Sequence, residues 1–186
     1  MLRRIVSAAV VTVALAAAYG CGSSGGDASV DAGLHRDRTL QPADAASSVT
    51  PNGNGQKTVS YHGVQFDVPA DWPVHDLAAD PNTCVRFDVN AVYLGHPSDN
   101  MDCPAGIIGR ADAVLVEPAD GNAGAHADEA PVGATASGVA LRVADDHAAR
   151  ALDANIPSAN VDVTLTYRDA DTTAQQVLGS FREVGS

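Results

Sequence analysis

Alternating apolar and polar residues predict most of the strands of this chain. Residues 58–61 and 64–68 alternate on either side of His62-Gly63, a pattern typical of two strands joined as a hairpin. Pro69 and Pro73 then end the second strand, because proline cannot donate a hydrogen bond to a sheet. Alternation or short apolar runs predict further extended segments at residues 84–89, 91–94, 111–117, 139–143 and, most clearly, 161–167.

Two or three helices are expected beside these strands. Asp171 is an N-cap residue, and the residues after it form an apolar stripe at helical spacing, Ala174, Val177, Leu178 and Phe181. Asp145 is a second candidate N-cap for a helix over residues 145–152, and residues 75–80 fit a helical turn. We therefore predict an α+β fold for residues 58–184: a single domain with an antiparallel or mixed sheet of five to seven strands and two or three helices on one face.

Two stretches lack the large apolar residues that a folded core needs. Residues 22–57 consist mainly of Gly, Ser, Ala, Asp, Asn and Pro, so they cannot bury enough surface to offset the entropy of ordering. We expect them to form a flexible tether with a root-mean-square reach of roughly 30 to 36 Å. Residues 118–137 have a similar composition, which predicts a mobile loop inside the domain.

The N-terminus has the parts of a bacterial signal peptide. Arg3 and Arg4 precede an uncharged, mainly apolar stretch at residues 5–20, and a Gly/Ser-rich segment follows it. The apolar stretch is short for a membrane-spanning helix, which needs roughly 20 apolar residues. Residues 1–20 are therefore predicted to be a signal peptide, which places the mature chain outside the cytoplasm.

Two cleavage sites are consistent with this signal. Cleavage after Ala18 would leave a secreted chain that begins at Tyr19. Cleavage before Cys21 is the alternative, because residues 18–21 resemble the lipobox of bacterial lipoproteins at Gly20 and Cys21, although Ala18 and Tyr19 depart from it. That resemblance implies that Cys21 carries acyl chains such as palmitate and anchors the chain to the outer face of the cell membrane.

The number of cysteines favours lipidation. The chain has three, and an odd exposed thiol is a liability in an oxidising compartment. With Cys21 lipidated, Cys84 and Cys103 can form a disulfide that closes a loop of about twenty residues and stabilises the fold by roughly 3 kcal/mol. The alternative, two buried free thiols, is disfavoured in this compartment.

Net charge limits the kinds of partner. The sequence has 23 acidic and 11 basic residues. Loss of Arg3 and Arg4 with the signal peptide leaves 9 basic residues and a net charge of −14. This charge argues against nucleic acid and anionic lipid as electrostatic partners. Solubility explains it more simply than an acidic binding face does.

Reactive side chains gather mainly near the first hairpin. They are His62, Asp71, Trp72, His75 and Asp76, and the predicted disulfide could bring His96 close to them. Such residues can form a metal or acid–base site, but a polar edge beside a tryptophan anchor is the simpler interpretation. Arg86 lies two residues before Asp88, which indicates a surface ion pair rather than a ligand contact.

The sequence carries no familiar catalytic or metal-binding motif. It has no G-x-S-x-G elbow, phosphate-binding glycine loop or H-E-x-x-H helix. We therefore assign no catalytic, cofactor-binding or metal-ligating residue and expect no cofactor.

Several segments are similar to an uncharacterised region of secreted actinobacterial proteins. They are VQFDVPADWPV at 64–74, DLA at 76–78, CVRFD at 84–88, AVYLG at 91–95, DCP at 102–104, GRA at 109–111 and LVEP at 115–118. In some of those proteins the region precedes a glycoside-hydrolase-like barrel, which does not follow here. The resemblance is strongest over 60–118 and looser for the last strand and helix. It implies an accessory module without transferable catalytic residues.

These features favour an envelope protein that is not an enzyme. We expect a binding or accessory module whose partner is a cell-wall component or an envelope protein. The alternative is a hydrolase or metal-dependent envelope enzyme that uses the His/Asp edge at residues 62–76. A small-ligand sensor is a third hypothesis, which a concave apolar pocket would favour.

Overall fold

The structure, a computed structural model, describes residues 47–107, 109–119, 127 and 131–185 of the chain. The predicted signal peptide, Cys21 and most of the predicted tether lie outside the described residues, as does much of the predicted loop at 118–137. The described residues all belong to one compact unit, Thr39–Ser186. No helix among them has the length and apolar character that crossing a membrane requires.

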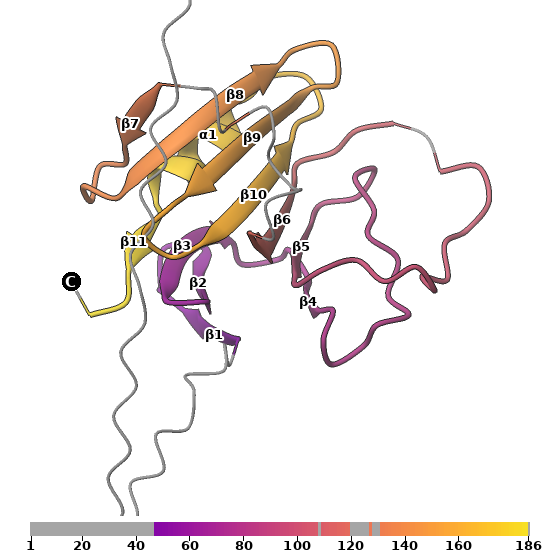
Figure 1. The fold of residues 1–186 in the computed structure, drawn as a ribbon. Coiled ribbons are helices and arrows are strands. Elements are labelled where there is room, and N and C mark those ends of the chain that lie inside the picture. Colours follow the sequence, from indigo (N-terminus) through magenta and orange to yellow (C-terminus); the bar gives the residue numbers. More distant parts are fainter. Residues whose placement is uncertain (1–46, 108, 120–126, 128–130, 186) are drawn as a thin grey trace, which may run out of the picture. The chain divides into compact units, whose positions relative to one another are not determined.

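The described strands form two sheets (Figure 1). The smaller sheet is antiparallel and has the order β1 (Ser48–Pro51), β2 (Gln56–Tyr61), β3 (Val64–Pro69) and β11 (Arg182–Glu183). The larger sheet has the order β4 (Val74–Asp76), β5 (Ala91–Leu94), β6 (Ala113–Pro118), β10 (Val161–Thr166), β9 (Ala151–Ile156), β8 (Ala140–Asp146) and β7 (Val132–Ala134). In it β4, β5 and β6 are parallel, and the strands from β6 to β7 pair antiparallel.

The predicted α+β fold is wrong. The described residues contain eleven strands in two sheets and one short helix, α1 (Thr172–Gly179), instead of one sheet covered by two or three helices. The hairpin β2–β3, the strands β5, β6 and β10, and α1 lie where alternation or helical spacing predicts them. The second sheet takes most of the role that the prediction gave to helices, because it covers one face of the larger sheet.

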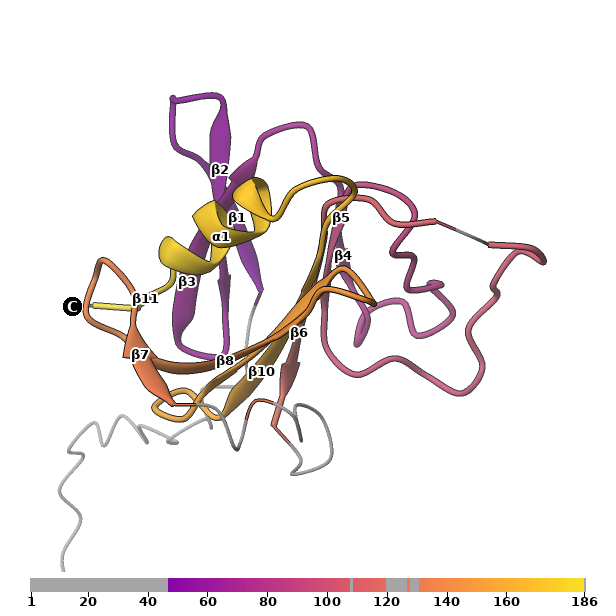
Figure 2. The same cartoon turned by 90° about the horizontal axis from the view of Figure 1, so that it is seen from above.

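The main core lies between the two sheets and α1. It includes Val59, Phe66 and Val68 from the hairpin, Val92, Val114, Leu152, Val163 and Leu165 from the larger sheet, and Val177 and Leu178 from α1. Figure 2 shows α1 beside β2 and β3, over the concave side of the larger sheet. Alternation along each strand directs these side chains inward. The core therefore depends on contacts between segments that are far apart in the sequence.

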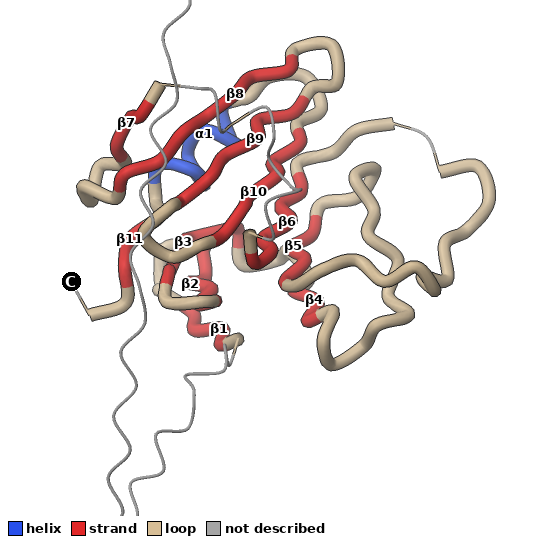
Figure 3. The backbone as a smooth tube through the Cα atoms, viewed as in Figure 1, coloured by secondary structure: helices blue, strands red, loops and turns tan. Residues whose placement is uncertain are grey.

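The predicted strand at 84–89 is not a strand. Its residues have no ladder partner and run as an irregular segment, but Val85, Phe87 and Val89 still pack as the alternation implies, against a second small core of Leu77, Ala91, Tyr93 and Leu115. Parallel strands usually need cover on both faces, which helices normally supply. Here the connections that flank β5 lie beside β4–β6 (Figure 3), and the segment 84–89 supplies apolar cover.

The predicted disulfide is present and fastens this covering segment. The Sγ atoms of Cys84 and Cys103 are 2.02 Å apart, and the bond joins the β4–β5 connection to the β5–β6 connection. The predicted helical turn at 75–80 is instead the end of β4 followed by turns.

The predicted helix at 145–152 is also wrong, because these residues form the β8–β9 hairpin. A side-chain cap exists, but Asp146 makes it: its carboxylate accepts hydrogen bonds from the backbone N–H groups of Ala148 and Ala149. Arg150 then adopts a φ of 55°, which ends any helical path. Alternation from Leu152 to Ile156 continues as β9.

The folded region begins before Thr58. Strand β1 lies inside the stretch that composition assigns to the tether, and it pairs with β2 along the edge of the smaller sheet. Strand β7 lies inside the predicted loop at 118–137 and pairs with β8. Both are short, exposed edge strands, so neither has the buried apolar face that a sequence pattern can detect.

Replacing Arg182 with alanine is expected to lower the free energy of unfolding by about 2 kcal/mol. Both terminal nitrogens of Arg182 lie 3.2 Å from Asp67 oxygens and hold β11 against β3. Burial acts to raise the pKa of Asp67, but hydrogen bonds from Thr58 and Arg182 and the guanidinium charge outweigh it and lower the pKa. Urea unfolding at neutral pH, beside the exposed Arg168→Ala as control, measures the loss.

This loss should depend on pH in a defined direction. Because the Asp67 pKa is lower in the folded chain than in the unfolded one, the pair stabilises the fold above the ordinary carboxyl pKa and ceases to do so as pH falls through the folded value. The difference between Arg182→Ala and the native chain should therefore shrink at acidic pH. A difference that is independent of pH would contradict this role of Asp67.

Candidate functional site

Polar side chains meet where the three parallel strands end. The register pairs Asp76 of β4 with Leu94 of β5, and Leu94 with Val116 of β6. Asp76 is therefore level with the end of β5, and Glu117 lies one residue beyond Val116 on β6. The carboxyl ends of parallel strands are a common place for binding sites, because side chains from separate segments converge there.

Tyr61, the last residue of β2, brings its hydroxyl to this edge. Its side chain belongs to the main core, and the residue is 7% exposed. A Cβ atom built on Gly95 would lie 3.7 Å from the Tyr61 hydroxyl, which places that hydroxyl over the end of β5. Among the described residues, no hydrogen-bond partner of the hydroxyl is present. The hydroxyl can donate a hydrogen bond to water or to a ligand at this edge.

Burial and nearby negative charges keep the Tyr61 hydroxyl protonated. Burial, followed by the negative charges of Asp76 and Glu117, raises the pKa of Tyr61 to about 12. The hydroxyl is therefore neutral at physiological pH and can both donate and accept a hydrogen bond.

Asp76 is held in place as an ionised carboxylate. The Ser47 hydroxyl donates to its Oδ2 atom at 2.6 Å, and the backbone N–H groups of Ala78 and Ala79 donate to its Oδ1 atom at 3.0 and 3.2 Å. The hydrogen bond from Ser47 is the largest influence on the pKa of Asp76, which is lowered. A carboxylate oxygen can accept two hydrogen bonds, so Oδ2 has capacity for another donor.

His96 and Glu117 complete the edge. The Nδ1 atom of His96 lies 3.1 Å from an Oε atom of Glu117, and the two side chains are 46% and 13% exposed. Gly95 precedes His96 with a φ of 107°, a conformation that favours glycine, and its N–H donates to the Val116 carbonyl. We call Tyr61, Asp76, Gly95, His96 and Glu117 the Tyr61 site.

The structure does not gather the predicted cluster around one point. His62 lies in the β2–β3 turn, where its ring packs on Tyr61 at 4.4 Å. Asp71 follows the other end of β3 and is exposed. The six-residue strands of the hairpin separate these two ends by roughly 20 Å. Trp72 is buried in the main core, and its carbonyl accepts a hydrogen bond from Lys57.

The remaining predicted residues lie on both faces of the larger sheet. Asp76 belongs to the Tyr61 site, whereas His75, its neighbour on β4, points to the opposite face and stacks on Tyr93 at 5.2 Å. Arg86 makes two hydrogen bonds to Asp88, at 2.6 and 3.0 Å, as the predicted ion pair. The residues on which the hydrolase hypothesis rests, His62, Asp71 and His75, therefore lie apart.

Sequence patterns indicated Asp76 and His96 but missed Tyr61 and Glu117. Tyr61 ends β2 and Glu117 is the penultimate residue of β6, and alternation marks the first as an ordinary core residue and the second as a polar residue near a strand end. Their proximity to Asp76 depends on the pairing of strands that are distant in the sequence.

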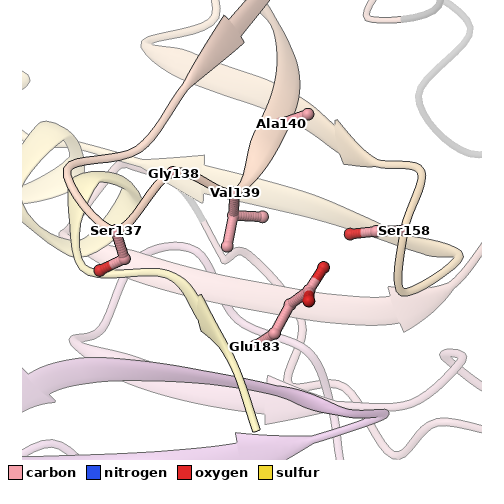
Figure 4. A pocket seen from close by; sticks show the side chains of 6 residues that line it. All are labelled: Ser137, Gly138, Val139, Ala140, Ser158 and Glu183. Atoms are coloured by element: carbon pink, nitrogen blue, oxygen red, sulfur yellow. The ribbon is translucent and has the colours of Figure 1, made fainter. Parts of the chain in front are cut away.

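A shallow pocket of about 240 Å³ lies elsewhere on the domain (Figure 4). It is lined by Ser137, Gly138, Val139, Ala140, Ser158 and Glu183. Two hydroxyls and one carboxylate can hydrogen-bond a small polar molecule, but the hydroxyls come from exposed turns.

A second pocket, of about 370 Å³, has an acidic lining beside the β8–β9 turn. His147 lies there, with its Nδ1 atom 3.2 Å from both Asp145 and the Tyr167 hydroxyl. Within the described ranges, no three His, Cys, Asp or Glu residues are grouped so that they could hold a metal ion.

Comparison with known proteins gives no match. No protein-family model matches the chain, and no curated protein or solved structure does so either. The proposals below therefore rest on the sequence and on the geometry described above.

Proposed function

We propose that the chain is an exported, lipid-anchored envelope protein that acts as a binding or accessory module through the Tyr61 site. The observation that carries this proposal is that the Tyr61 side chain and the fixed Asp76 carboxylate come together at the ends of β4 and β5, close enough for the charge of Asp76 to raise the pKa of Tyr61. A hydroxyl and a preorganised carboxylate at the ends of parallel strands can hydrogen-bond a polar ligand there.

The proposed anchor and the site are connected along the chain. Ser47, the first described residue, donates its hydroxyl to Asp76. The composition predicts that the residues between Cys21 and Ser47 are a tether, and a flexible chain of that length reaches roughly 25 to 30 Å. We therefore expect the ligand of the Tyr61 site to lie close to the outer face of the cell membrane. The ligand is a component of the cell wall or another envelope protein. The resemblance to an accessory region of secreted actinobacterial proteins supports the same proposal.

The full-length chain with Cys21→Ser is expected to co-sediment with purified cell wall or to capture an envelope protein. Tyr61→Phe should weaken that retention, because it removes one hydroxyl and keeps the ring that packs in the core. Asp71→Asn is the matched control, since Asp71 is exposed at the far end of the hairpin. The measurement is the bound fraction against wall concentration. If the native chain is retained by neither wall nor envelope proteins, the proposal fails.

A further inference from the structure

A third pocket lies at the end of the larger sheet opposite the Tyr61 site. Asn90 directly precedes β5, Asp112 directly precedes β6, and Arg168 closely follows β10; these three strands are neighbours (Figure 1). Because β5 and β6 are parallel, their first residues lie at one end of the sheet and their last residues at the other. The three residues, together with Asp169 and Ala170, line a pocket of about 290 Å³, which we call the Arg168 pocket.

Hydrogen bonds join the segments that form this pocket. The backbone N–H of Asp112 donates to Asn90 Oδ1 at 3.2 Å, and the backbone N–H of Arg168 donates to Asp112 Oδ1 at 3.3 Å. Beside them, the buried Thr166 hydroxyl donates to the Ala111 carbonyl at 2.8 Å and holds the end of β10 against the start of β6. The fold itself therefore positions the polar groups of the pocket.

The pocket holds groups of both charges that can still bind a ligand. In the part of the chain that the structure describes, the Arg168 guanidinium has no hydrogen bond or salt bridge, although two carboxylates line the same pocket. Arg182, by contrast, is paired with a carboxylate at 3.2 Å. Asp112 Oδ2 and the Asp169 carboxylate can each accept a hydrogen bond, and the Asn90 amide nitrogen can donate one, because the side-chain oxygen of Asn90 is already used.

We propose that the Arg168 pocket binds a zwitterionic amino acid, which carries a carboxylate and an ammonium group on one small carbon skeleton. A guanidinium binds a carboxylate through two parallel hydrogen bonds. An ammonium has three N–H donors and no acceptor, which suits the carboxylates of Asp112 and Asp169. The two aspartates would repel a simple anion and Arg168 would repel a simple cation, so a molecule with both charges fits better than either.

The size and place of the pocket agree with such a ligand. Its volume lies just below the range of about 300 to 1,000 Å³ that is typical for drug-sized molecules, so it suits a smaller one. The length of β5, roughly 13 Å, separates the pocket from the Tyr61 site. The Arg168 pocket is therefore a second binding site, whose ligand need not be the one that the Tyr61 site binds.

The test is a nuclear magnetic resonance titration of the full-length chain carrying Cys21→Ser. The probes are glycine, alanine, leucine, glutamate and lysine. For the amino acid that binds most tightly, the controls are its Nα-acetyl derivative, which lacks the α-ammonium, and its α-amide, which lacks the α-carboxylate. We expect saturable shifts of the Asp112 and Arg168 backbone amide signals with at least one amino acid, with a dissociation constant of about 1 mM or lower. Both controls should bind more weakly.

Two variants locate the binding. Arg168→Gln should weaken amino-acid affinity about tenfold, the effect of losing a charge-assisted contact, and should then bind the amino acid no better than its amide. Asp112→Asn should weaken affinity as well, because it removes one of the two carboxylates. Asp71→Asn makes the same chemical change at a distant exposed position and should bind as the native chain does. Because Arg168 is exposed, Arg168→Gln keeps the test valid if Asp112→Asn unfolds.

Three results would each overturn the proposal: no saturable shift with any of the five amino acids, equal binding of the amino acid and both derivatives, or unchanged affinity in Arg168→Gln. None of them bears on the proposed function, because retention by cell wall is measured separately with Tyr61→Phe.

Discussion

Replacing Phe181 with alanine is expected to lower the free energy of unfolding by about 4 kcal/mol. Phe181 is fully buried, and its ring stacks on that of Phe66 with centroids 4.6 Å apart. It lies between α1 and β11, so it ties the end of the chain to the β2–β3 hairpin. Alanine would remove this contact and leave a cavity in the main core, which the surrounding strands can fill only in part.

Urea unfolding followed by Trp72 fluorescence measures this effect, because Trp72 is the single tryptophan and is buried in the same core. Val184→Ala is the control: Val184 is 54% exposed, and its loss should change the free energy of unfolding by less than about 0.5 kcal/mol. If Phe181→Ala and Val184→Ala unfold at the same urea concentration, the C-terminal segment does not belong to the core.

The double substitution Cys84→Ser/Cys103→Ser is expected to destabilise the domain by about 3 kcal/mol. The two cysteines are 19 residues apart, and their bond restricts the unfolded chain. In the folded chain the bond also holds the segment that covers Tyr93 and Leu115. Without it, this cover should open more readily and expose the second core to solvent.

Reduction provides an independent measurement of the same quantity. Dithiothreitol should shift the urea midpoint of the native chain to that of the double variant, and it should leave the midpoint of the double variant unchanged. Cys21→Ser is the control and should behave as the native chain does in both conditions. A double variant as stable as the native chain would show that the packing of Val85, Phe87 and Val89 is sufficient to hold the cover.

Sequence patterns predicted the elements that have one buried and one exposed face. Strand β10 shows this best, because Val163 and Leu165 face the main core while Thr164 bonds Asp153 on the other face. The same pattern gave a wrong prediction at 84–89. The apolar side chains there pack against the larger sheet, but the backbone pairs with no strand. Alternation reports which side of an extended segment is buried, and it says nothing about hydrogen-bonded neighbours.

The helix predictions failed where they relied only on a capping residue and on local composition, and no tertiary contacts of a helix stabilise the segment. Asp146 caps a turn in the same way that it would cap a helix, and the alanines that follow tolerate both structures. Pairing of β9 with both β8 and β10 decides the outcome, because its residues from Ala151 to Asn155 gain partners on two sides. A short stretch of sequence does not show which strands will pair with it.

The candidate site was predictable only in part for a related reason. The sequence shows a histidine and carboxylates near the first hairpin, and Asp76 and His96 do belong to the Tyr61 site. Whether another candidate residue joins the Tyr61 site depends on the face of the sheet to which its side chain points. His75 and Asp76 are neighbours in the chain, yet the pleat of β4 directs them to opposite sides of the sheet.

The disulfide over the parallel strands also affects when this chain can become stably folded. Disulfides form in oxidising compartments, whereas cytosolic thiols are kept reduced. If the chain is exported as its N-terminus predicts, the precursor is less stable inside the cell than the mature protein outside it, by the same margin of about 3 kcal/mol. A chain that passes unfolded through a secretion channel benefits from this order of events. Export comes first, oxidation follows, and the finished domain then resists unfolding in the place where it acts.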